Sequence, residues 1–120
     1  SLYLLGKYMA LGKKFEEALE ILEKYIHLKA YNADAYLIIG YCYYKLGQYK
    51  KALENFKKSL SLRIDNPKCL YNLTKVFIKL NRHEDARVTM ERLIHFKPVH
   101  PQVTHLKKYF DSLKKPDSKE

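Results

Sequence analysis

The chain has 120 residues, of which 47% are hydrophobic and 30% are charged, with only four glycines and four prolines. This composition excludes collagen-like and disordered chains, and the length suits one domain whose core needs no disulfide or metal. The net charge of +10 favours an acidic protein, a nucleic acid or an anionic membrane surface as the partner.

Apolar residues at helical spacing predict seven helices. Glycine, asparagine and aspartate separate the first of them, because no proline occurs before Pro67. The predicted helices span residues 2–12, 15–29, 33–46, 49–62, 67–80, 83–96 and 101–114.

A single repeat period organises the chain. Small side chains recur at equal intervals, at Ala18, Ala52 and Ala86. The same interval separates Phe15, Tyr49 and His83, which stand three positions before these alanines. It also separates Gly6 from Gly40. The segments "FEEALEILEKYI", "YKKALENFKKSL" and "HEDARVTMERLI" each place apolar residues at helical spacing around the small residue. Because one helix–turn–helix unit takes up roughly 34 residues, which is this interval, the sequence predicts three stacked units.

Small residues in each unit have a predicted structural use. Gly40 and Ala52 are expected to let the two helices of the central hairpin approach closely. Gly47, in "KLGQY", predicts the left-handed residue that ends the third helix. The corresponding loop in the first unit is ambiguous by one residue, because Gly12 stands one place before the position that matches Gly47.

The central unit, residues 33–66, resembles the tetratricopeptide repeat. Its matches to the pattern aromatic-x-x-Leu-Gly-x-x-Tyr, followed by Ala-x-x-x-Phe, are Tyr36, Ile39, Gly40, Tyr43, Ala52 and Phe56. The third unit fits through Leu70, Leu73, Phe77, Ala86, Met90 and Pro98, with Thr74 in place of the glycine. The first unit fits through Leu5, Gly6, Ala18 and Leu22.

This resemblance implies an all-α fold, a right-handed superhelical stack of helix–turn–helix repeats, or α-solenoid. The repeats are expected at about residues 1–32, 33–66 and 67–100. A helix at 101–114, which begins at Pro101, is expected to cap and solubilise the end of the stack, with a disordered tail at 115–120. The apolar side predicted for this helix carries Val103, Leu106, Tyr109, Phe110 and Leu113.

The resemblance also implies a concave groove, lined by the first helix of each repeat, in which a peptide or helix of another protein lies. Tyrosines beside lysines would suit an acidic and partly hydrophobic segment. The alternative is that some of these tyrosines only pack between neighbouring helices. The residues expected to face the groove are Tyr3, Lys7, Ile38, Tyr41, Tyr44, Lys45, Tyr71, Asn72, Lys75 and Lys79.

One specific mode of binding in this family fits the sequence poorly. Adaptors that bind chaperone tails use a carboxylate clamp of two lysines, two asparagines and one arginine. The corresponding positions here are Tyr3, Lys7, Ile38, Lys68 and Asn72. Because only Lys68 matches, an extended or helical partner segment is favoured over a clamped C-terminus.

No catalytic, metal or cofactor site is expected. His95, His100 and His105 are five residues apart, a spacing that does not place metal ligands on one helical face. Cys42 and Cys69 fall in apolar helical stretches, where buried and unreactive thiols are typical. The glycines are isolated, so they form no phosphate-binding loop. The protein is therefore predicted not to be an enzyme.

Three other functions remain open at this stage. Lysines and tyrosines could bind nucleic acid, although lysine predominates over arginine and no nucleic-acid motif is present. A truncated first repeat could leave an apolar end for self-association. The chain could also be a regulatory part of a larger enzyme or complex subunit, since it begins at Ser1 without methionine. The uncharged stretch Ala35–Tyr44 is too short for membrane insertion, and the two cysteines favour an intracellular, cytoplasmic or nuclear location.

Overall fold

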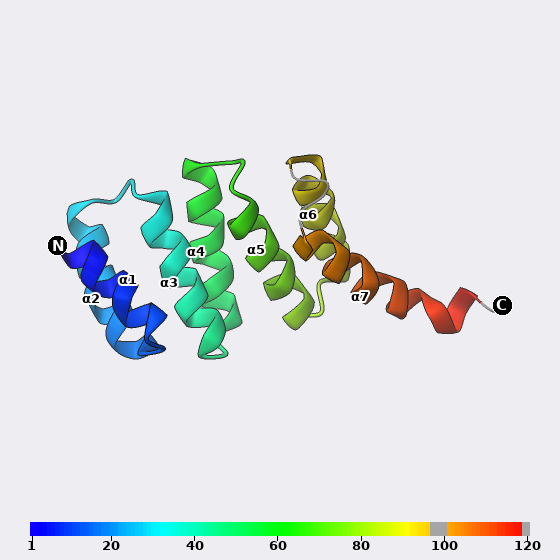
Figure 1. Cartoon of the computed structure of the whole chain (residues 1–120), viewed down its shortest axis with the longest axis horizontal. Coiled ribbons are helices and arrows are strands. Elements are labelled where there is room, and N and C mark those ends of the chain that lie inside the picture. Colours follow the sequence, from blue (N-terminus) through cyan, green and yellow to red (C-terminus); the bar gives the residue numbers. More distant parts are fainter. Residues whose placement is uncertain (97–100, 119–120) are drawn as a thin grey trace.

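A computed structural model describes residues 1–96 and 101–118 of the chain, and these residues form seven α-helices. The helices stack along an elongated molecule of 56 × 26 × 21 Å, with the two chain ends at opposite ends of the long axis (Figure 1). The helices are α1 (Leu2–Leu11), α2 (Phe15–Leu28), α3 (Ala33–Lys45), α4 (Tyr49–Leu62), α5 (Pro67–Lys79), α6 (His83–Phe96) and α7 (Pro101–Ser118).

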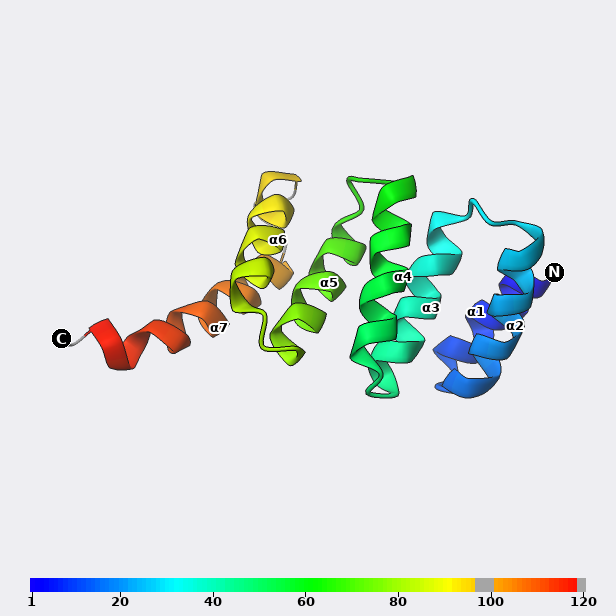
Figure 2. The ribbon, with the colours of Figure 1, turned by 180° about the vertical axis from the view of Figure 1, so that it is seen from behind.

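The fold is the predicted all-α stack of helical hairpins. The pairs α1–α2, α3–α4 and α5–α6 follow one another along the long axis in both views (Figures 1 and 2). Within the described ranges, the main contacts join helices that are adjacent or next but one in the chain. Each hairpin therefore completes its core against its neighbours, as expected of a repeat stack.

The first six helices begin at the predicted residues and end within one residue of the predicted ends. The seventh helix differs, because its backbone continues to Ser118 instead of ending at residue 114. Residues 115–118 are therefore helical, whereas the sequence predicted a disordered tail there, and residues 119–120 lie outside the described part. The prediction ended the helix before Pro116 because proline lacks an N–H. In the structure the last turn continues past this residue with one backbone donor fewer.

Asparagine residues form the N-caps of the first helix in the second and third hairpins. Asn32 accepts a hydrogen bond from the Ala35 amide at 3.0 Å, and Asn66 accepts one from the Lys68 amide at 3.1 Å. These bonds satisfy backbone donors that the first turn of a helix leaves free. The "YNAD" and "DNPK" segments therefore fix where α3 and α5 start.

The turns inside the three hairpins share one backbone geometry. The residues with positive φ are Lys13 (64°), Gly47 (78°) and Asn81 (59°), which stand at the same position of successive repeats. Gly12 has a φ of −82°, so the ambiguity in the first loop resolves in favour of Lys13. The repeat thus imposes a left-handed residue at this position even where the sequence supplies a lysine.

Close contact between the two helices of a hairpin depends on the absence of a side chain. A Cβ atom added to Gly40 would lie 2.7 Å from the Cδ1 atom of Phe56, and one added to Gly6 would lie 2.5 Å from the Cγ atom of Leu22. Phe56 is fully buried, so its ring has no free space into which to move. The repeat pattern places Thr74 and Met90 at the same two positions of the third hairpin.

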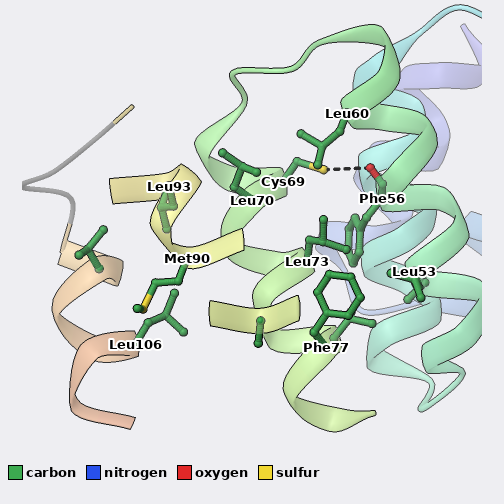
Figure 3. Packing of buried hydrophobic residues seen from close by; sticks show 14 of the residues in the cluster. Leu53, Phe56, Leu60, Cys69, Leu70, Leu73, Phe77, Met90, Leu93 and Leu106 are labelled. Carbon is green, nitrogen blue, oxygen red and sulfur yellow. Dashed lines mark hydrogen bonds between the residues drawn. The ribbon is translucent and has the colours of Figure 1, made fainter. Parts of the chain in front are cut away.

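The core formed by α4 and the third hairpin is continuous with that of α7. Phe56 of α4 and Leu73 of α5 belong to the same buried cluster as Leu93 of α6 and Leu106 of α7 (Figure 3). The Cys69 thiol donates a hydrogen bond to the backbone carbonyl oxygen of Phe56 at 3.3 Å (Figure 3). Apolar side chains thus connect the last four helices without a break.

Two polar contacts add to the packing around α3. The Tyr43 hydroxyl donates to the Glu23 carboxylate at 2.6 Å and so connects α3 to α2. The buried Ser59 hydroxyl donates to the Ala33 carbonyl oxygen at 2.8 Å and connects α4 to α3. Burial, followed by the bond to Glu23, raises the pKa of Tyr43 to about 12.

The seventh helix packs on the stack through its first turns. Val103, Leu106 and Phe110 are buried, whereas Leu113 is 42% exposed. Leu113, which the sequence places on the same apolar side, lies where this contact ends. The C-terminal part of α7 projects beyond the hairpins (Figure 1).

Candidate functional site

The residues predicted to face the groove lie on α1, α3 and α5, the first helices of the three hairpins. Eight of the ten line one of three cavities that run along these helices: Tyr3, Lys7, Ile38, Tyr41, Tyr44, Asn72, Lys75 and Lys79. The other two, Lys45 and Tyr71, contact members of this set. We name the cavities after Tyr3, Tyr41 and Lys75.

The Tyr41 cavity, of about 230 Å³, lies between α1, α3 and α5. The Tyr41 ring meets Phe15 edge to face at 6.1 Å between centroids, and the Lys45 ammonium lies 5.9 Å from the same ring. Tyr41 is 36% exposed, so part of its ring is accessible while these contacts set its position. The lining residues are Lys7, Ala10, Leu11, Leu37, Ile38, Tyr41, Lys68 and Asn72.

The Tyr3 cavity adjoins the Tyr41 cavity and has a volume of about 680 Å³. The residues that line both cavities are Lys7, Leu37, Ile38 and Lys68. Tyr3 packs on Tyr25 at 5.6 Å between ring centroids, and burial is the main cause that raises its pKa. Asp34 and Arg63, 3.6 Å apart, give this cavity charges of both signs.

The Lys75 cavity, of about 490 Å³, lies at the other end of the row, between α3, α5 and α7. The Lys75 ammonium lies 5.1 Å from the centre of the Tyr44 ring and 5.0 Å from that of Tyr71. Burial, and then the charges of Lys45 and Lys79, hold the pKa of Lys75 below its ordinary value. The lining residues are Tyr44, Lys75, Ile78, Lys79, His105, Leu106, Lys108 and Tyr109.

The tyrosines predicted to face the groove differ in their surroundings. The sequence had left open whether each one is exposed or only packs between neighbouring helices. Tyr44 is half-buried and packs on Tyr49 at 5.6 Å between centroids, and burial is the main cause that raises its pKa. Tyr3 and Tyr71 are also half-buried, whereas Tyr41 is exposed. Tyr41 therefore has the freest aromatic surface among these four.

Sequence reasoning missed the contribution of α7 to the Lys75 cavity. His105, Lys108 and Tyr109 line it, although α7 was expected only to cap the stack. The repeat period would have indicated two of them. His105 stands one period after Tyr71, and Tyr109 stands one period after Lys75.

The positions of the carboxylate clamp do meet in space, although their side chains differ from it. Lys7, Ile38, Lys68 and Asn72 line the Tyr41 cavity, and Tyr3 lines the adjoining one. Ile38 introduces an apolar surface where the clamp has a polar group. The five positions thus lie close together in the structure, with a chemical lining different from that of the clamp.

The other candidate sites from the sequence have structural explanations. Cys42 and Cys69 are buried free thiols, and burial raises their pKa values to about 12 and about 11, which opposes the reactive thiolate. Among the described residues, no three histidine, cysteine, aspartate or glutamate side chains gather at a metal-binding distance. His100 and Pro98 lie outside the described residues.

None of the helices in the described part of the chain combines the length and the apolar character needed to cross a bilayer.

Comparisons with known proteins agree with this architecture. Residues 12–93, more than half of the chain, match the family model described as anaphase-promoting complex, cyclosome, subunit 3. The tetratricopeptide repeat-containing protein trd-1 of Caenorhabditis elegans is 26% identical over 99 residues, which are 82% of this chain and 13% of that protein. The chain spans only 13–22% of the length of the curated relatives it matches.

Two solved structures share the fold. The first tetratricopeptide domain of Spaghetti (RPAP3), bound to the HSP90 peptide SRMEEVD, is 20% identical with a TM-score of 0.87; the match covers 93% of this chain and 90% of that one. PcrH, in complex with the chaperone-binding region of PopD, is 19% identical with a TM-score of 0.84; the match covers 97% and 90%.

Proposed function

Because this chain belongs to the tetratricopeptide-repeat family represented by the model for subunit 3 of the anaphase-promoting complex, we propose that it binds a segment of another protein. The segment lies along α1, α3 and α5, in the groove formed by the Tyr3, Tyr41 and Lys75 cavities. The observation that carries the proposal is the row of three cavities on the first helices of the hairpins. Rows of partly apolar cavities with a few polar groups are typical of binding surfaces.

The partner segment in this proposal is both apolar and acidic. The Tyr41 cavity supplies apolar surface through Leu11, Leu37 and Ile38. Lysines lie beside it, and the net charge of +10 would attract an acidic segment from a distance. The peptide bound by Spaghetti contains two glutamates and an aspartate, which supports an acidic ligand on this fold. Because only Lys68 of the clamp positions matches, the proposal does not include a clamped C-terminus.

The role that follows is that of a non-catalytic adaptor or scaffold. Its fold places most of the tyrosines and lysines named above on one row of helices, and burial opposes ionisation of the two thiols. An intracellular location, cytoplasmic or nuclear, belongs to the same proposal. It is supported by Cys42 and Cys69, which are both unpaired.

Selection of peptides from a display library tests the groove. We expect the chain to retain peptides that combine an aromatic or branched apolar residue with glutamate or aspartate. Tyr41→Ala should weaken the selected peptides at least about tenfold, as loss of a central aromatic anchor does. Fluorescence anisotropy of labelled peptides would measure the change.

Tyr31→Ala is the matched control, because Tyr31 is 87% exposed and lies in the loop between α2 and α3. It should change the affinity less than about twofold. Circular dichroism would first establish that both variants keep their helices. Equal losses in the two variants, or no loss in either, would place the binding surface outside the groove.

A second candidate function, self-association, is favoured by the exposed face of α1. Leu2, Leu5 and Tyr8 are 38–63% exposed. The residues one and two repeat periods later are at most 9% exposed, because the preceding hairpin covers them: Tyr36, Ile39 and Cys42, then Leu70, Leu73 and Val76. The first hairpin thus presents a stacking surface that the other two bury.

Light scattering after size exclusion tests this candidate. If α1 mediates self-association, the mass should rise above that of one chain as concentration increases, and Leu5→Glu should return it to one chain. Leu28→Glu is the control, since Leu28 is 74% exposed at the far end of α2. A single-chain mass at every concentration would exclude self-association through this face.

A further inference from the structure

We propose that the Lys75 cavity is an anion subsite, which receives an aspartate or glutamate side chain of the bound segment. This inference rests on the proposed function, since it specifies which end of the groove takes the acidic part of the partner. The subsite differs in place from the carboxylate-clamp positions, which gather around the Tyr3 and Tyr41 cavities. It includes α7, which supplies one wall.

The position of the Lys75 ammonium is fixed by two aromatic rings. It lies about equally far from the ring centres of Tyr44 and Tyr71, at 5.1 and 5.0 Å. Tyr44 is itself held by Tyr49, and Lys75 is only half-buried, so the charge is oriented but still reachable from the cavity. A charge held in this way loses little conformational freedom when an anion binds.

The charges around Lys75 are of one sign. Lys45 and Lys79 are close enough to disfavour its charged form. His105 and Lys108 of α7 line the same cavity, and no carboxylate among the side chains that the structure describes does. In the described part of the chain every ion pair uses an arginine, namely Arg63, Arg82 or Arg87. The lysines of this cavity therefore have no acidic partner among the described residues.

A half-buried ammonium among other cations is unfavourable for the free chain. Burial and like charges both act against the charged form, whereas the two rings attract it. A carboxylate placed in the cavity would reverse the sign of the nearest charge and leave the ring contacts in place. The arrangement therefore stabilises an occupied cavity more than an empty one.

The variant Lys75→Met distinguishes a lysine that binds an anion from one that only stabilises the fold. Methionine retains an unbranched apolar side chain against Tyr44 and Tyr71 but removes the charge. Because the folded state disfavours that charge at neutral pH, we expect the melting temperature of the free chain to rise. Affinity for an acidic ligand should fall at the same time. A lower melting temperature with unchanged affinity for an acidic ligand would show a purely structural role and would overturn the proposal.

The probe for direct binding is an acetylated and amidated peptide of six glutamates. The peptide would be added stepwise at low salt, and nuclear magnetic resonance would follow the signals of the Lys75 side chain. We expect the Lys75 signals to shift on addition of the peptide, and Lys75→Met to weaken binding at least tenfold. Lys57→Met is the matched control, because Lys57 is exposed on α4 and should leave the affinity unchanged.

The outcomes separate this subsite from the wider proposal. If library peptides bind through Tyr41 but hexaglutamate leaves the Lys75 signals unmoved, the subsite is wrong and the groove remains. If hexaglutamate binds at Lys75 but the library yields no peptide, the subsite stands without the proposed function. If a single-stranded oligonucleotide moves these signals and hexaglutamate does not, the site binds nucleic acid and the proposal is overturned.

Discussion

Replacing Gly40 with threonine is expected to lower the free energy of unfolding by about 2 kcal/mol, and adding Phe56→Met should restore much of the loss. The first effect arises because the new Cβ atom would lie 2.7 Å from two ring carbons of Phe56. Phe56 is fully buried, so relief requires the helices to separate. Overpacking of this kind outweighs the few tenths of a kcal/mol that threonine gains over glycine in helix propensity.

The third hairpin shows why methionine should compensate. Thr74 and Met90 occupy the positions of Gly40 and Phe56, and both side chains are buried. The Thr74 hydroxyl donates to the Leu70 carbonyl oxygen at 2.8 Å, so its polar atom is satisfied within α5. Methionine is flexible and narrower than phenylalanine, which leaves room for the threonine methyl group.

Urea unfolding of the two single variants and the double variant would measure the coupling. We expect the double variant to lose about 1–2 kcal/mol less free energy of unfolding than the two single variants lose together. Gly12→Ala serves as the control, because a Cβ atom there would meet its nearest neighbour, the Tyr8 carbonyl oxygen, at an ordinary 3.5 Å. Strictly additive losses would mean that Gly40 is needed for something other than the ring of Phe56.

Leu106→Asp is expected to release α7 from the stack. Leu106 is 1% exposed within the cluster shared by α4, α5, α6 and α7, and a buried carboxylate without a partner costs several kcal/mol, of order 3 or more. Since α7 is the last helix, it can avoid this loss by leaving its site while the hairpins stay folded. Hydrogen exchange should then accelerate strongly in α7 and much less in α3 and α4.

Leu113→Asp is the matched control on the same helix. Leu113 is 42% exposed, so we expect a change in stability within about 0.5 kcal/mol and no change of exchange in α7. Equal exchange rates in the two variants would contradict the view that Leu106 anchors the helix. Release of α7 should also remove His105 and Lys108 from the Lys75 cavity, which a weaker response to hexaglutamate would report.

The order and limits of the helices could be predicted because they depend on local patterns. Spacing of apolar residues and the repeat period identify six of the seven helices to within one residue at each end. The turn at Lys13 could not be predicted from residue preference, since Gly12 is the better candidate by type. There the constraint comes from the geometry of the hairpin turn. The backbone N–H of Lys14 donates a hydrogen bond across the turn to the carbonyl oxygen of Met9, five residues earlier, at 2.9 Å.

Part of the groove could be predicted from the sequence. The period assigns positions to α1, α3 and α5, but it does not show whether a tyrosine packs or stays exposed. Tyr44 and Tyr41 are three residues apart on α3, and only the neighbouring helices make one half-buried and the other exposed. The enclosure of Lys75 by two rings likewise depends on how α3 and α5 approach each other. Such contacts follow from the stacking and not from any local motif.

The linear arrangement of the hairpins has a mechanical consequence. Because the two chain ends lie at opposite ends of a 56 Å stack, tension applied between them passes through every interface in series (Figure 1). An interface in series carries the full load and shares none of it, so the weakest one yields first and the others remain closed. Under force, this molecule would lengthen in steps, one interface at a time.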